Sequence, residues 1–122
     1  MGIIKKDKEI ARLKSSDLAK KGGFYVNYAY DSSHPGQLMV AIRIGRCHRK
    51  AVERNKFRRW IKEILRWWLK ESDFKHRKFG LNLLVSVGVK DKSVSFSYVK
   101  ETLTEILDDI VKRYAEGNKT LT

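Results

Sequence analysis

The stretch from Ala51 to Trp68, AVERNKFRRWIKEILRWW, constrains the fold more than any other part of the chain. It holds six basic side chains and three tryptophans in eighteen positions. At about 100° per residue, its aromatic and aliphatic side chains fall within one arc of about 160°, and most of its cations lie on the opposite side. The pattern therefore predicts an amphipathic helix that packs on a hydrophobic core and turns a cationic face outward.

Four of these cations, Arg54, Arg58, Lys62 and Arg66, follow one another at four-residue intervals. Like charges at this spacing destabilise a helix by about 0.2–0.5 kcal/mol per pair. A helix that only faces water usually intersperses acidic residues, so the repulsion favours an anionic partner. Because the planar guanidinium of arginine suits phosphate better than an ammonium does, we favour nucleic acid over a merely solvated face.

The charge of the whole chain supports the same interpretation. Its 122 residues carry 27 Lys and Arg against 14 Asp and Glu, a formal net charge of +13. Eleven basic and two acidic residues lie between Arg43 and Lys70, whereas acidic residues outnumber basic ones from Lys100 onward. Such an uneven distribution attracts polyanions to one side of a small domain.

The apolar periodicity predicts a single α+β domain over residues 1–122, an αβ sandwich in which helices cover a small sheet. The predicted order of elements is α-β-β-α-β-α. A short amphipathic helix over 6–20 comes first, and we expect Gly22 and Gly23 to end it because paired glycines supply the backbone freedom of a helix stop.

The remaining elements follow from local composition. Strands over 24–30 and 38–44 are predicted to pair as a hairpin, because β-forming residues flank a Pro-Gly turn. The apolar run 81–89 suits an inner strand that is covered on both faces. A final helix over 96–116 is predicted to start at the N-cap Ser95 and to stop before the next glycine.

Several protein classes are disfavoured by what the sequence contains. The single cysteine, Cys47, cannot form an internal disulfide, which is typical of proteins in the reducing cytoplasm. No run approaches the roughly 20 apolar residues that span a bilayer. Cys47 and the three histidines show no catalytic-triad or metal-ligand spacing, so the sequence names no metal site. We therefore predict a cytoplasmic protein that does not enter a membrane.

The residues from Arg46 to Glu63, RCHRKAVERNKFRRWIKE, carry a recognisable motif. They resemble the signature of the bacterial ribonuclease P protein subunit, K-K-V-G-N-A-V-x-R-N-R-x-K-R-x-x-R-E, without gaps. The identical positions are Ala51, Val52, Arg54, Asn55, Arg59 and Glu63. Lys56, Arg58 and Lys62 replace one cation by another, whereas the Gly-Asn pair of the family falls on Arg49 and Lys50. The predicted order of elements also follows this family over nearly the whole chain.

The resemblance implies an accessory role beside a ribozyme. In this family a catalytic RNA with bound Mg²⁺ hydrolyses the phosphodiester that joins the 5′ leader to precursor tRNA. The protein then has no catalytic residues and no cofactor of its own, and the Mg²⁺ is bound chiefly by the RNA. The implied partners are the catalytic RNA, with one protein per RNA, and precursor tRNA.

Two surfaces follow from the resemblance. The basic helix and the loop before it would contact the catalytic RNA through Arg46, Arg49, Lys50, Arg54, Asn55, Lys56, Arg58, Arg59 and Lys62. A cleft between the first helix and the sheet would hold the single-stranded leader, with Ile10, Lys14, Tyr28 and Arg43 at the matching positions. Tyr28 could stack on a base or pack under the first helix, and both interpretations stay open.

Two other functions fit parts of the sequence. A noncatalytic ribosome- or DNA-binding module would also use a basic helix, but DNA readers usually have a compact helix-turn-helix, whereas strands flank this helix on both sides. A helix lying on an anionic membrane would need to expose Phe57, Trp60 and Ile64, which are the expected cover of the sheet.

Overall fold

The computed structural model describes residues 1–45, 50–88 and 94–121, with side chains described as far as Tyr114. Its elements are β1 (Gly2–Ile3), α1 (Asp7–Lys14), β2 (Asp17–Lys21), β3 (Phe24–Asp31), β4 (Leu38–Ile44), α2 (Ala51–Glu71), the 3-10 helix η1 (Phe74–His76), β5 (Gly80–Val87) and α3 (Phe96–Leu121). The fold is α+β, as predicted, with a mixed sheet of five strands.

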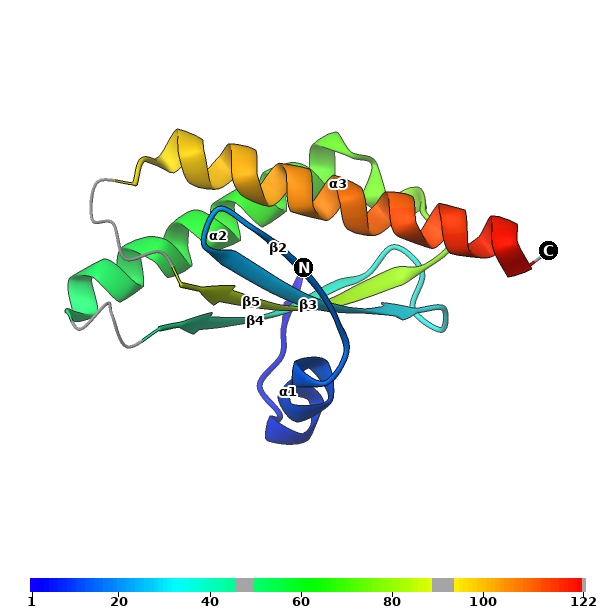
Figure 1. Cartoon of the computed structure of the whole chain (residues 1–122), viewed down its shortest axis with the longest axis horizontal. Coiled ribbons are helices and arrows are strands. Elements are labelled where there is room, and N and C mark those ends of the chain that lie inside the picture. The colour runs from blue at the N-terminus through cyan, green and yellow to red at the C-terminus, as the bar shows by residue number, and fades with distance from the viewer. Residues whose placement is uncertain (46–49, 89–93, 122) are drawn as a thin grey trace.

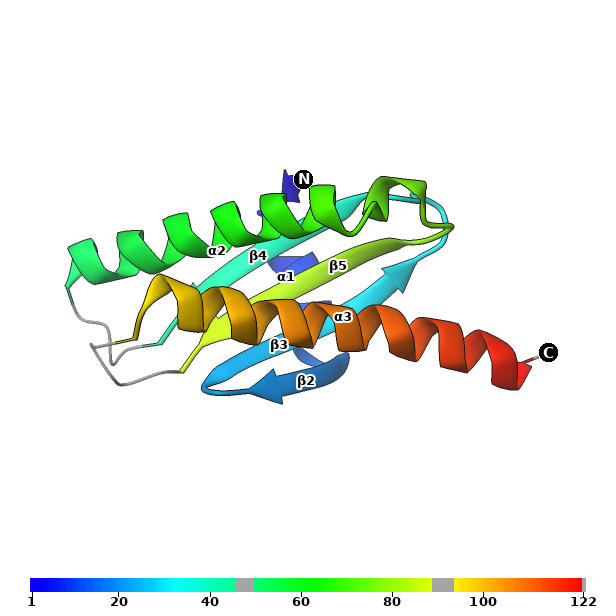
Figure 2. The ribbon, with the colours of Figure 1, turned by 90° about the horizontal axis from the view of Figure 1, so that it is seen from above.

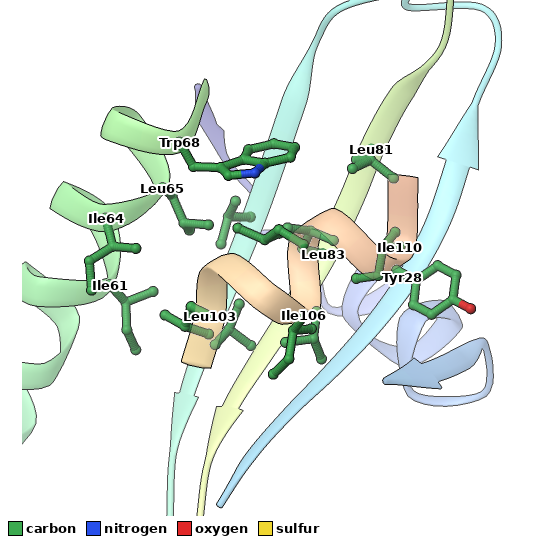
Figure 3. Packing of buried hydrophobic residues seen from close by; sticks show 14 of the residues in the cluster. Tyr28, Ile61, Ile64, Leu65, Trp68, Leu81, Leu83, Leu103, Ile106 and Ile110 are labelled. Carbon is green, nitrogen blue, oxygen red and sulfur yellow. The ribbon is translucent and has the colours of Figure 1, made fainter. Parts of the chain in front are cut away.

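Helices lie on both faces of the sheet (Figure 1). α2 and α3 run side by side over one face, and α1 covers part of the other (Figure 2). The larger core lies under α2 and α3, where Leu83 of β5 is buried with Leu65 and Leu103 (Figure 3). A smaller cluster under α1 contains Leu13 and Leu84. Adjacent residues of β5 thus enter different layers, as the alternation of side chains along a strand requires.

The predicted hairpin of β3 and β4 is wrong. The strand order is β1-β4-β5-β3-β2, so β5 lies between them, parallel to β4 and antiparallel to β3. The turn at Gly36 is hydrogen-bonded to the start of β5. The Gly36 N–H donates to the Phe79 carbonyl at 3.0 Å, and the Leu81 N–H donates to the Gln37 carbonyl at 2.9 Å. β5 takes the centre because it is the most completely apolar strand and is buried on both faces there.

The first helix is also shorter than predicted. It ends at Lys14, and Asp17–Lys21 forms the edge strand β2, paired with β3. Gly22 and Gly23, with φ of 57° and 86°, form the two-residue turn of this hairpin instead of ending a helix. Positive φ at both turn residues gives the chain twist that antiparallel strands need. The short β1, which pairs with β4, was not predicted either.

The final helix begins as predicted but runs further. The Tyr98 N–H donates to Ser95 Oγ at 3.2 Å, which confirms Ser95 as the N-cap. The helical backbone continues through Gly117 to Leu121. A single glycine inside a helix costs only about 1 kcal/mol relative to alanine, so its presence alone does not end the element.

The apolar face of α2 is buried against the core, as the periodicity of its sequence predicts for all but one residue. Phe57, Ile61, Ile64, Leu65 and Trp68 are buried, and Trp68 Nε1 donates to Asp108 Oδ1 at 3.0 Å. Trp67 is the exception within the predicted core arc, because 39% of its surface is exposed. The Lys100 ammonium lies 4.0 Å from the centroid of the Trp67 ring, which places a cation over this exposed aromatic face.

Tyr30 links β3 to α3 and gives the fold a dependence on alkaline pH. Its hydroxyl donates to the Ile110 carbonyl at 2.6 Å, and burial, followed by the neighbouring Tyr28, raises the pKa of Tyr30 to about 12. The unfolded chain releases this proton near pH 10, so the stabilisation is complete below about pH 10 and is lost as pH rises toward 12. We expect the urea midpoint to fall over that range, and to fall less for Tyr30→Phe.

Tyr25→Phe is the matched control, because Tyr25 lies on the same strand but is exposed and faces away from α3. Its urea midpoints should follow those of the unmodified protein between pH 10 and 12. A Tyr30→Phe variant that loses as much stability as the unmodified protein over this range would contradict the assignment to Tyr30.

Candidate nucleic-acid interface

α2 turns a cationic surface away from the sheet. Five residues of this surface are exposed: Asn55, Arg58, Arg59, Arg66 and Lys70. A sixth, Lys62, lies between them and is half-buried. We call these six residues the α2 cationic strip. They lie opposite the buried face of the helix, so the fixed apolar contacts of α2 also fix the direction in which the strip points. The described geometry therefore agrees with the predicted separation of core and cationic faces.

Lys56 lies at the border between the two faces of α2. Its ammonium is 4.9 Å from the centroid of the Trp60 ring and 5.4 Å from that of Phe57. Trp60 in turn makes an edge-to-face contact with Phe96, the first residue of α3, at 5.6 Å between ring centroids. The Lys56 cation is thus attracted to the π faces of these rings, and no acidic residue in the described part of the chain pairs with it.

The approach to α2 is only partly described. Lys50 is exposed and extended, and its carbonyl accepts the Arg54 N–H at 3.2 Å, which starts the helix. Unpaired N–H groups and the helix dipole make such a start locally positive, which favours phosphate near Lys50. Arg46 and Arg49, the other predicted contacts of this loop, lie outside the described residues.

Three of the four predicted cleft residues share the α1 face of the sheet. Ile10 packs against the small cluster under α1, and Lys14 is exposed at the end of the helix. Arg43 follows the buried Ala41 by two positions in β4, so it points to the same face, and it is exposed. A cavity of about 390 Å³ lies between α1 and the sheet, and Arg12, Met39 and Asn82 help to line it.

Tyr28 is not in this cleft. The burial of Phe24 and Val26 sets the alternation of β3 and turns Tyr28 toward α3, on the opposite face. Only 5% of Tyr28 is exposed, and its hydroxyl accepts a hydrogen bond from Arg113 Nη1 at 3.0 Å. The placement of Tyr28 with Ile10 and Lys14 was therefore wrong, and it packs beneath α3 rather than beneath the first helix.

The aromatic residue that does reach the α1 face is Tyr25, with 42% of its surface exposed. In the sheet register Tyr25 lies between Lys20 of β2 and Ser86 of β5, and Ser86 pairs with Arg43. A Cβ on Gly88 would come within 2.8 Å of the Tyr25 ring, so the glycine leaves room for it. The alternation of residues 24–30 already places Tyr25 and Tyr28 on opposite faces of the strand. It does not say which of the two faces stays open to solvent.

The described residues do not suggest a metal centre or a membrane span. No group of three or more His, Cys, Asp or Glu among them is placed to hold a metal ion. His34 and His76 each pair with a single aspartate, at 2.8 Å to Asp31 and 2.6 Å to Asp73. Across the described ranges, no helix is long and apolar enough to cross a bilayer.

Comparison with known families settles the relationship of this chain. The family model for ribonuclease P matches residues 3–111, which include α1, the strands β2 to β5 and α2 with its strip. The chain belongs to the ribonuclease P protein family. It is therefore a protein subunit of ribonuclease P, which acts in maturation of the 5′ end of tRNA.

Solved structures of ribonuclease P proteins share this fold. The RNase P protein from Thermotoga maritima aligns with a TM-score of 0.66 and 20% identity, over 88% of this chain and 96% of that one. The Staphylococcus aureus RNase P protein aligns with a TM-score of 0.67 and 18% identity, over 90% and 95%. Comparison with curated protein sequences finds no match. The fold of this ribonuclease P protein is thus retained at low sequence identity.

Proposed function

We propose that this ribonuclease P protein is noncatalytic and binds the catalytic RNA through α2, one protein per RNA, in the cytoplasm. The observation that carries the proposal is the α2 cationic strip, of which Asn55, Arg58, Arg59 and Lys62 lie in the family motif. The RNA contacts we propose are Arg46, Arg49, Lys50, Arg54, Asn55, Lys56, Arg58, Arg59 and Lys62. Each phosphate neutralised there releases counterions, so affinity falls steeply as salt rises.

The α1 face is the proposed site of the 5′ leader of precursor tRNA. Ile10, Lys14 and Arg43 lie on that side of the sheet, and the cavity between α1 and the sheet, which none of the three lines, supplies a concave surface. Tyr25 offers an exposed ring between Lys20 and Arg43, which suits a single strand whose bases stack on aromatic rings while its phosphates meet cations. Tyr28, buried under α3, is not part of this surface.

The Mg²⁺ of the reaction is assigned to the catalytic RNA. The described residues offer no cluster of carboxylates that could hold it, whereas cations dominate the surface of α2. When bound, Mg²⁺ can activate a nucleophile and stabilise the charge of the reacting phosphodiester. The contribution of the protein is to neutralise and position RNA phosphates, which reduces the repulsion between closely approaching RNA segments.

Reconstitution tests this function. Added to a bacterial-type catalytic RNA at low Mg²⁺, the protein is expected to restore 5′ cleavage of precursor tRNA, measured as release of the labelled leader. The gain should shrink at high Mg²⁺, because the metal then screens the same phosphates. Protein without RNA should give no cleavage. Failure to stimulate several such RNAs at any Mg²⁺ concentration would contradict the proposal.

A further inference from the structure

A second group of cations lies at the far end of α2, in the connection to β5. Four consecutive residues, Lys75, His76, Arg77 and Lys78, are all exposed between the buried Phe74 and Phe79. We call these four residues the η1 basic loop. The two phenylalanines anchor its ends in the core, and the four polar residues between them are held at the surface. The family motif in α2 does not include this loop.

The backbone of the η1 basic loop is firmly held. The Arg77 N–H donates to the Phe74 carbonyl at 2.9 Å and the His76 N–H to the Asp73 carbonyl at 3.2 Å, and the side-chain Nδ1 of His76 lies 2.6 Å from Asp73 Oδ1. Asp73 adopts φ of 55°, a left-handed conformation that is unfavourable for a residue with a Cβ. A Cβ on Gly36 would come within 2.3 Å of the Lys75 carbonyl oxygen, so the β3–β4 turn closely abuts the loop. The loop therefore displays its cations from a fixed frame.

The stability of the protein alone does not account for these charges. Asp73 is already engaged by His76, and within residues 1–45, 50–88 and 94–114 no ion pair involves Lys75, Arg77 or Lys78. One cation in the last turn of a helix is favourable beside its partly negative end, and Lys70 of α2 already occupies that position. Three further unpaired cations instead repel one another.

We propose that the η1 basic loop is a second phosphate-binding surface, which contacts a duplex segment of the same RNA that α2 binds. The inference rests on the proposed function of α2. The 21 residues of α2 separate Lys50 from the loop by about 30 Å. Cations fixed at both ends of a rigid helix suit the regular phosphates of a stiff duplex, because a flexible single strand would lose conformational entropy to follow them.

The test compares two triple variants that remove the same number of charges. Lys75→Ala with Arg77→Ala and Lys78→Ala retains His76 and its contact with Asp73. The control is Lys5→Ala with Lys6→Ala and Lys8→Ala, three exposed residues at the start of the chain and α1. Binding of each to the catalytic RNA alone, without precursor tRNA, is measured across a salt series, and thermal melts check that both variants fold.

The η1 variant is expected to bind the catalytic RNA roughly tenfold to a hundredfold more weakly near physiological salt. Its slope of log affinity against log salt should become shallower by about 2.7, because each of the three lost phosphate contacts removes about 0.9. The control should match the unmodified protein. Equal affinity and slope for the two variants would overturn the inference while leaving the α2 function intact, whereas no binding by the unmodified protein would overturn both.

Footprinting of the RNA backbone tests the duplex assignment. Phosphates that become accessible only when the η1 variant replaces the unmodified protein should lie in base-paired RNA. Loss of protection confined to single-stranded RNA would overturn the duplex part of the inference.

Discussion

Replacing both Arg58 and Lys62 by alanine is expected to weaken binding of the catalytic RNA by about 100-fold. Both residues belong to the α2 cationic strip, one turn apart on its outward side. If each contributes one charge-assisted bond to phosphate, a loss of about 1.4 kcal/mol per residue multiplies to this factor. Filter binding or fluorescence anisotropy at fixed salt measures the change, and the salt slope should fall by roughly 1.8.

The same substitutions should make the free protein slightly more stable. Arg58 and Lys62 take part in three like-charge pairs at four-residue spacing along α2, and removing them relieves about 1 kcal/mol of repulsion. Chemical denaturation checks this expectation. Lys5→Ala with Lys8→Ala serves as the charge-matched control and should change neither property much. If the Arg58/Lys62 variant binds as tightly as this control, the α2 cationic strip is not part of the RNA interface.

The parts of the fold that the sequence predicts are those fixed by local periodicity. The apolar arc of α2, the N-cap Ser95 and the inner position of β5 are all consequences of which neighbouring residues are apolar. The pairing of β3 and β4 is different, because the intervening strand comes about forty residues later. A Pro-Gly turn fits a hairpin or a wider connection equally well, and burial of β5 decides between them.

In the candidate site, too, features set by neighbouring residues are predictable from the sequence, whereas features set by tertiary contacts are not. The cationic strip is predictable because helix geometry alone separates it from the tryptophans. The position of Tyr28 depends instead on which face of β3 the two long helices cover, which is set by contacts with α2 and α3. Family resemblance places Tyr28 only by its position along the chain, which carries no information about its face and does not point to Tyr25.

Replacing Leu83 by alanine is expected to give the largest loss of stability, about 4 kcal/mol. Leu83 is fully buried in the central strand, pairs in register with Tyr28 and Val40, and lies under both long helices (Figure 3). Leucine-to-alanine changes in well-packed cores cost about 2–5 kcal/mol, with most loss where the surroundings cannot collapse. Such a loss is a large fraction of the roughly 5–15 kcal/mol of a typical domain, so urea denaturation will detect it readily.

Leu84→Ala is the matched change on the other face of the same strand. Leu84 is also buried, but its cluster under the short α1 is small: Ile4, Leu13 and Ala41 are its buried members, and Ile10, Ala29 and Met39 are only partly buried. We expect the short α1 to relax into the space. We expect a smaller loss, about 2–3 kcal/mol. Because α1 alone is loosened, this variant should keep its affinity for the catalytic RNA while losing preference for leader-bearing over mature tRNA. Leu83→Ala should instead reduce binding of the catalytic RNA in proportion to the folded fraction and leave the preference between the two tRNA substrates unchanged. A Leu84→Ala variant that loses affinity for the catalytic RNA together with the preference would contradict the separation of the two surfaces by the sheet.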